Sequence, residues 1–347
     1  MAVYTTIDDP EAYFQVKLTT GSGDAQAVTF DGDTDMQPDL IWGKRRDSTG
    51  HPTIFDAVRG ITKGLETNGT GAEFTSTDYY TAFGSDGFTI AAGASGAGNG
   101  SSQTAVQWCW KANGSGSSNE DGSINTTSTS VNTTAGFSIS SYTGNGSGSA
   151  TIGHGLTVAP SFVIIKCISA VDAWQVYSTG ATRLVLNVTT ADQGSHGITK
   201  GATTITTASA VDNGWNGSGE DYIMYCFAEK QGYSKFGSYK GNGNANGTFV
   251  FLGFRPAMVI IKKTSDTGNW NLFDNKRDGI NASDGNENLF ANANDADSVG
   301  NNRIDIVSNG FKLKASTADV GTSGGTYVFM AFAESPFVNS KGVPNNA

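Results

Sequence analysis

One motif in the sequence could hold a catalytic nucleophile. Gly321-Thr-Ser323-Gly-Gly325 matches the G-x-S-x-G pattern, in which a serine sits on a sharp turn between a strand and a helix. Here the motif precedes an apolar, strand-like segment, and the corresponding loop earlier in the chain reads Gly217-Ser-Gly219. We therefore interpret the motif as a turn, because Gly- and Ser-rich loops produce this match readily. We predict no catalytic residues.

Histidine and cysteine do not form a shared site either. The three histidines fall at unrelated positions of the repeat described below: His51, His154 and His196. The three cysteines are too few and too widely spaced for a zinc site or a disulfide framework: Cys109, Cys167 and Cys226. We interpret the histidines as surface residues and the cysteines as small buried apolar residues. We predict no cofactor and no metal.

A short acidic segment resembles the start of a calcium-binding loop. Asp31, Asp33 and Asp35 place carboxylates at alternate positions, as such a loop does. Met36 stands where the loop requires glycine, and Trp42 stands where it requires a bidentate glutamate. We favour a solvated turn, and a weak, non-standard calcium site remains the alternative.

Exposed tryptophan and tyrosine side chains could bind sugars by stacking on pyranose rings. Most of the tryptophans recur at matched positions of the repeat, which is typical of buried core residues: Trp108, Trp110, Trp174, Trp215 and Trp270. Tyr79 and Tyr80 have no counterpart in the other copies and lie in a polar segment. They are our candidate binding residues, with ordinary packing as the alternative.

A glycoside hydrolase would need two carboxylates at a defined separation in one site. The acidic residues of this chain lie mostly in predicted turns, and Glu229 and Glu334 recur because they end the same strand. A glycan-active hydrolase is therefore a secondary alternative, and we expect a protein that is not an enzyme.

The decisive feature is a block that occurs three times without a gap. It reads PDLIWGK from Pro38 to Lys44, PSFVIIK from Pro160 to Lys166, and PAMVIIK from Pro256 to Lys262. The flanking motifs also recur: a Gly-x-Gly turn, a Leu-x-x-Asn motif, an Asp/Asn-Gly-aromatic motif (86–88, 213–215 and 309–311) and a closing apolar strand. Fixed spacing over so many positions indicates a triplicated unit.

Within each unit, short runs rich in β-branched and aromatic residues alternate with turn residues, which predicts strands. Some runs alternate in polarity, whereas FVIIKCI and YIMYCFA are apolar throughout and suit strands covered on both faces. We therefore predict an all-β protein of three tandem β-sandwich, jelly-roll-like domains.

The predicted boundaries are 1–112 for the first sandwich with its N-terminal segment, 136–231 for the second, and 232–347 for the third with its tail. The segment 113–135, nearly all Gly, Ser, Asn and Thr, is predicted to be a flexible linker. On this basis units two and three would form a rigid pair, and unit one could be placed independently.

Composition excludes several classes of partner. The net charge is −10, whereas a nucleic-acid surface needs clustered Lys and Arg, so we expect no nucleic acid. No run approaches the length that spans a bilayer, and the N-terminus lacks the features of a signal peptide. We expect synthesis in the cytoplasm without a signal peptide and no membrane insertion.

Several phrases resemble a domain that recurs in structural proteins of marine bacteriophages. They are IDDPEAYFQVKLTTG, FDAVRGITKGLETN, SYTGNGSGSATIGHGLTVAP and YCFAEKQGYSKFGSYKGNG. The resemblance covers nearly the whole chain and implies a virion component, without assigning any catalytic or binding residue. Unit two departs from the pattern: 11 residues separate Trp215 from Phe227, whereas 21 separate Phe88 from Trp110, so we expect one shorter loop there.

The resemblance implies a virion location and a tail-fibre or appendage protein that attaches to the host through β-loop surfaces. A capsid decoration or head-fibre protein is the alternative. The expected partners are other virion proteins, further copies of the chain in a homo-oligomer, for which we expect a trimer, and a glycan or receptor on the host surface.

Overall fold

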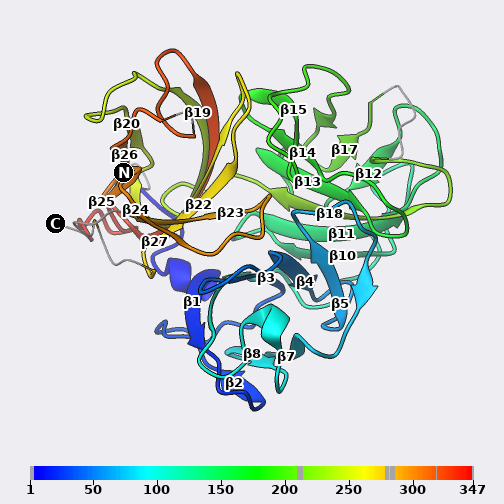
Figure 1. Ribbon diagram of the computed structural model, residues 1–347. Helices are drawn as coiled ribbons and strands as arrows, with labels where there is room; N and C mark the ends of the chain where they lie inside the picture. Colours follow the sequence, from blue (N-terminus) through cyan, green and yellow to red (C-terminus); the bar gives the residue numbers. More distant parts are fainter. Residues whose placement is uncertain (1–3, 209–213, 278–280, 282–285, 318, 346–347) are drawn as a thin grey trace.

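The computed structural model describes residues 4–208, 214–277, 281, 286–317 and 319–345. These residues form strands and two 3₁₀ turns, η1 (Pro10–Ala12) and η2 (Ser95–Ala97), and contain no α-helix. No helix in this part of the chain could cross a membrane. Three two-layer β-sandwiches surround a common centre (Figure 1), so the prediction of three all-β sandwich units is confirmed.

Each sandwich pairs a six-stranded sheet with a three-stranded sheet, and all pairings between neighbouring strands are antiparallel. In unit one the large sheet follows the order β1 (Phe14–Thr20), β9 (Thr104–Trp110), β3 (Leu40–Arg45), β4 (Thr53–Asp56), β5 (Lys63–Glu66) and β6 (Phe74–Thr75). Its small sheet follows the order β2 (Gln26–Val28), β8 (Gly87–Ile90) and β7 (Tyr80–Gly84).

Unit two repeats this plan with one change in the large sheet: it has an added strand, β10, at one edge and no counterpart of β6 at the other. Its large sheet follows the order β10 (Ser128–Asn132), β11 (Phe137–Thr143), β18 (Asp221–Phe227), β13 (Phe162–Cys167), β14 (Gln175–Ser178) and β15 (Ala181–Val185). Its small sheet follows the order β12 (Thr151–Gly153), β17 (Thr204–Thr206) and β16 (Thr199–Lys200).

Unit three has the same arrangement as unit one. Its large sheet follows the order β19 (Ser234–Lys240), β27 (Thr326–Pro336), β21 (Phe254–Lys263), β22 (Trp270–Asp274), β23 (Asn286–Phe290) and β24 (Ser298–Asn301). Its small sheet follows the order β20 (Phe249–Phe251), β26 (Gly310–Leu313) and β25 (Ile304–Val307).

Each sandwich has a core of its own between its two sheets. One aromatic side chain from the same repeat position enters each of these cores: Phe55, Tyr177 and Phe273. The closing strand contributes Cys109, Cys226 and Ala331 at another matched position. The predicted burial of the cysteines is confirmed, and all three are free thiols.

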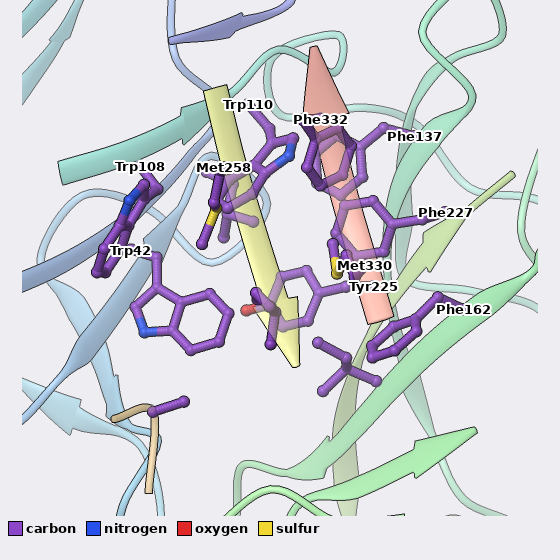
Figure 2. Close-up of a cluster of buried hydrophobic side chains, with 14 of the residues drawn as sticks. Trp42, Trp108, Trp110, Phe137, Phe162, Tyr225, Phe227, Met258, Met330 and Phe332 are labelled. Carbon is purple, nitrogen blue, oxygen red and sulfur yellow. The ribbon is translucent and has the colours of Figure 1, made fainter. Parts of the chain in front are cut away.

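A fourth core lies where the three large sheets face one another. It contains buried side chains from all three units, and Figure 2 shows the rings of Trp110, Phe137, Phe227 and Phe332 gathered in it. The Phe332 ring centroid lies 5.4 Å from that of Trp110 and 5.8 Å from that of Phe227. The large sheets are therefore buried on both faces, which explains why runs such as FVIIKCI are apolar throughout.

The strand pairing and the shared core correct two expectations, one about the predicted linker and one about the mobility of unit one. The segment 113–135 contains β10, which pairs with β11 in the register Val131↔Ser138, so it is part of the second large sheet and not a free linker. Unit one contributes Trp108 and Trp110 to the common core. The expectation that unit one can be placed independently is wrong, because moving it would expose this apolar face.

The sheet register also corrects the repeat alignment in unit two. Ile205 pairs with Ile152, as Phe88 pairs with Val28 and Phe311 with Val250, so Ile205 is the counterpart of Phe88 and Phe311. Ile205 precedes Phe227 by 22 positions, the same spacing as from Phe88 to Trp110. The predicted shorter loop is wrong. Asn213, which begins the motif that we aligned there, lies outside the described residues.

Candidate functional site

The recurring lysine of each unit reaches into a neighbouring unit. Each lysine is buried in the large sheet, and its Nζ donates to a backbone carbonyl of a loop in the neighbour. The Nζ–O distances are 3.4 Å from Lys44 to Asn294, 3.4 Å from Lys166 to Thr70, and 3.2 Å from Lys262 to Thr189. Unit one thus binds unit three, unit two binds unit one, and unit three binds unit two.

The same three carbonyls accept a second hydrogen bond, from a backbone N–H twelve positions after the recurring proline. The N–O distances are 2.8 Å from Gly50 to Asn294, 2.9 Å from Asp172 to Thr70, and 2.9 Å from Gly268 to Thr189. Each accepting residue lies two positions after the asparagine of the Leu-x-x-Asn motif. Two motifs far apart in the repeat therefore meet across every unit boundary.

A third backbone bond completes each contact. The residue eight positions after the recurring proline accepts from the neighbouring loop, with N–O distances of 2.8 Å from Asp297 to Arg46, 2.9 Å from Glu73 to Ile168, and 2.9 Å from Asp192 to Thr264. We call the lysine bond and these two backbone bonds together the inter-unit clamp. Three clamps close the sandwiches into a ring.

Burial changes the ionisation of the clamp lysines. It lowers the pKa of Lys44, Lys166 and Lys262 to about 8 in each case, because the ammonium group loses hydration in the sheet. Bonds to carbonyls of the lysine's own unit also hold the ammonium, such as the 2.8 Å bond from Lys262 Nζ to Lys263 O. The clamp thus places a charge in a site with little water and surrounds it with carbonyl dipoles.

Two of the three boundaries also contain a buried Asp–Arg pair. In unit one, Arg59 Nε lies 2.6 Å from Asp56 Oδ2, and Tyr225 of unit two donates its hydroxyl to the same oxygen over 2.7 Å. The burial that lowers the pKa of Arg59 is outweighed by the nearby Asp56 carboxylate, and the net effect is a raised pKa.

The second pair lies in unit three. Arg277 Nε lies 2.6 Å from Asp274 Oδ2, and the Trp108 indole of unit one donates to that oxygen over 3.1 Å. The guanidinium of Arg277 also lies over the Trp108 ring, 5.7 Å from the centroid. At the matched positions the remaining boundary has Ser178 in place of the aspartate and Met330 in place of the aromatic donor.

Two tryptophans link units in a similar way. Trp174 Nε1 donates to Glu66 O over 3.0 Å, and Trp270 Nε1 donates to Val185 O over 3.0 Å. All five tryptophans that we predicted to be core residues are buried, although the sheet register shows that Trp215 does not lie at a repeated position. Sequence reasoning missed that the recurring Lys and Leu-x-x-Asn positions meet across unit boundaries; their matched spacing in all three copies was the available signal.

The structure separates the two tyrosines that we predicted to bind a partner. Tyr80 has no exposed surface, and its ring packs on Phe55 and Phe88, so this residue cannot contact a partner in the present structure. Tyr79 is partly exposed, and its ring centroid lies 5.2 Å from that of Phe55. A binding role for Tyr79 stays a prediction.

The other candidates for chemistry do not converge. Ser323 is exposed in a turn that leads into a strand, not a helix. Asp31, Asp33 and Asp35 are exposed, and Asp31 pairs with Lys17 over 2.6 Å. Within the described residues, no group of three or more His, Cys, Asp or Glu side chains could hold a metal ion.

The positions of the three histidines correct one expectation. His154 is fully buried, whereas we expected a surface residue. Its Nδ1 accepts from Leu156 N over 3.1 Å, and its Nε2 lies 3.2 Å from Gly201 O, so the ring bridges two loops of unit two. Burial lowers the pKa of this imidazole. His51 and His196 are exposed.

The fold and its clamps define a ring of three β-sandwiches within a single chain, in which recurring polar residues join the units. The chain belongs to the family DUF7483, a domain of unknown function, whose model matches residues 9–336. The matched range spans all three units, as expected for sandwiches that share one core. Comparisons with curated proteins and with solved structures give no match.

Proposed function

We propose that this protein is a non-enzymatic structural component of a bacteriophage virion, an appendage or tail-fibre protein that presents loops to the host surface. The observation that carries the proposal is the use of the recurring polar residues. Lys44, Lys166 and Lys262 join sandwiches, and their partners are carbonyls of the same chain. The recurring lysines thus hold a closed ring of sandwiches together, which suits a structural role.

The resemblance to repeated domains of marine phage structural proteins supplies the virion part of the proposal. Rigid β-scaffolds hold loop tips in fixed positions, and many weak contacts made by such tips add up through avidity. The central faces of the large sheets are occupied by the shared core, so a homo-oligomer of this chain would have to use the outer surfaces.

Labelling of purified virions with an antibody against this protein tests the location. A signal confined to the tail supports an appendage, whereas a signal spread over the head contradicts it and indicates a capsid decoration. Absence of the protein from purified particles would refute the virion role altogether.

An activity assay tests the non-enzymatic part of the proposal. The purified protein should release no reducing ends from host polysaccharide. Release that is lost when one carboxylate, such as Glu229 or Glu334, is neutralised would instead indicate a glycan hydrolase.

A further inference from the structure

Unit three has an open groove at one edge of its sandwich. In units one and two the corresponding edge is covered by other parts of the chain. The groove has a volume of about 510 Å³ and lies between β19 and β20, which are edge strands of the large and small sheets. Its lining includes Tyr4, Glu229, Gln231, Lys235 and Phe251. This volume is within the range of small-molecule sites.

Aromatic rings are exposed in and beside this groove. Tyr4 is 50% exposed and Phe251 is 55% exposed, and they come from segments far apart in the chain. Lys235 Nζ lies 5.4 Å from the centroid of the Phe251 ring. Phe249 has the same orientation on β20 and is 45% exposed, but it does not line the groove. Such rings are exposed at a cost, because apolar surface favours burial.

The repeat provides an internal control for these rings. Val250 of unit three and Val28 of unit one occupy the same register position, and both are buried. The exposed neighbours are Phe249 and Phe251 in unit three but Ala27 and Thr29 in unit one. The sandwich therefore forms without aromatic residues at these positions, so the fold does not require Phe251.

The covering of this edge also differs between the units. In unit one the loop after β2 lies against β1, where Gly32 N donates to Gln15 Oε1 over 3.3 Å and Asp31 pairs with Lys17. In unit two, β10 pairs along the matching strand β11. In unit three only Leu252 and Gly253 separate β20 from β21, so no comparable loop follows β20.

We propose that this groove binds a saccharide. The apolar faces of Tyr4 and Phe251 suit the C–H face of a pyranose ring, and Glu229, Gln231 and Lys235 offer hydrogen-bond acceptors and donors to its hydroxyl groups. A purely apolar partner would leave these polar groups desolvated and unpaired. The inference deepens the proposed function and rests on it, since it names the surface and the ligand class through which attachment occurs.

The groove is suited to binding and not to hydrolysis. Glu229 is the single acidic residue among its lining residues, whereas glycoside hydrolysis generally requires two carboxylates in one site. The bound saccharide is therefore expected to be released unchanged.

The test uses the full-length protein and an array of oligosaccharides built from neutral hexoses, N-acetylated hexosamines and uronic acids. Titration calorimetry then measures the affinity of the best ligand for the wild type, Phe251→Ser and Phe249→Ser. The two variants remove similarly exposed rings from one strand, so Phe249→Ser is the matched control. Circular dichroism confirms that both variants fold, as expected for changes at exposed positions.

Binding that weakens about tenfold or more in Phe251→Ser, and changes less than about twofold in Phe249→Ser, supports the groove. Glu229→Gln should also weaken binding. Absence of binding to every sugar on the array, or equal loss in both phenylalanine variants, overturns the inference. Self-association of the wild type that Phe251→Ser abolishes, measured by sedimentation velocity, also overturns it, because the groove would then be an interface between copies.

These outcomes are independent of the virion test. A protein located on the tail that binds no saccharide refutes the groove alone. A saccharide-binding protein that is absent from purified particles refutes the proposed function while the groove stands.

Discussion

Trp108 of unit one donates its indole N–H to Asp274 of unit three, with an Nε1–Oδ2 distance of 3.1 Å. The two residues are 166 positions apart in the chain. The bond joins the first sandwich to the last, so the order of units in space is cyclic although the order in sequence is linear.

The shared core should make unfolding cooperative. Each large sheet buries one face in its own sandwich and the other in the common core, so no unit can unfold without exposing the apolar faces of the others. We expect a single calorimetric transition in which the van't Hoff and calorimetric enthalpies agree. Separate transitions for unit one and for the pair of units two and three would contradict the common core.

Phe332 should be among the most sensitive core positions. Its ring lies within 6.0 Å, centroid to centroid, of Phe14, Trp110, Phe227, Tyr233 and Phe236. Phe332→Ala should lower the free energy of unfolding by about 3–5 kcal/mol in urea denaturation, because a cavity would remain among these rings. Phe249→Ala at the exposed surface is the control and should change it by less than about 0.5 kcal/mol.

The buried pair at the boundary of units one and two should be sensitive to the loss of one partner. Asp56→Asn removes the nearer of the two carboxylates that pair with the Arg59 guanidinium, the other being Glu73 at 3.2 Å, and should cost about 3–5 kcal/mol of unfolding free energy. The double variant Asp56→Ser, Arg59→Met removes both charges and should cost less, since the boundary with Ser178 and Met330 lacks the matched aspartate. Chemical denaturation measures both, and equal or greater loss in the double variant would show that the charges themselves stabilise the ring.

The clamp lysines should make stability depend on pH. The pKa of Lys44 is about 8 in the folded protein, compared with 10.5 for an unperturbed lysine. Between these values the unfolded chain binds more protons, so the contribution of Lys44 to stability rises with pH, by at most about 1.4 kcal/mol per pH unit.

Lys44→Met isolates this effect. Other titrating groups contribute equally to both proteins, so they cancel in the difference. Denaturation at pH 7, 8 and 9 should show the wild type gaining stability relative to the variant above pH 8. A difference that is independent of pH would mean that Lys44 keeps an ordinary pKa in the folded protein.

The sequence was sufficient to predict the three-unit organisation, because the spacing downstream of Pro38, Pro160 and Pro256 is the same in all three copies. The ring was not predicted. The apolar run FVIIKCI indicates a strand covered on both faces, but composition alone does not say whether the second cover is the sandwich's own small sheet or another unit. The Gly- and Ser-rich composition of 113–135 likewise predicts flexibility, whereas β10 forms because β11 offers an unpaired edge.

Errors at single residues have similar causes. Trp215 follows Asn-Gly as Phe311 does, and Phe88 follows Asp-Gly, yet strand pairing shows that Ile205 occupies the equivalent position in unit two. The sequence around Tyr80 is typical of a polar loop. In the structure Tyr80 begins strand β7, and its side chain lies in the core of unit one. The groove of unit three is present because the loop after β20 is short. The sequence does not show this, because the corresponding loops can be compared only after the three sandwiches are superposed.

Asp8 and Ser340 lie near opposite ends of the sequence but are in contact, since the backbone N–H of Ser340 donates to Asp8 Oδ1 over 2.6 Å. A circularly permuted gene, in which the old termini are fused by a short spacer and new ones open between units one and two, should encode the same architecture.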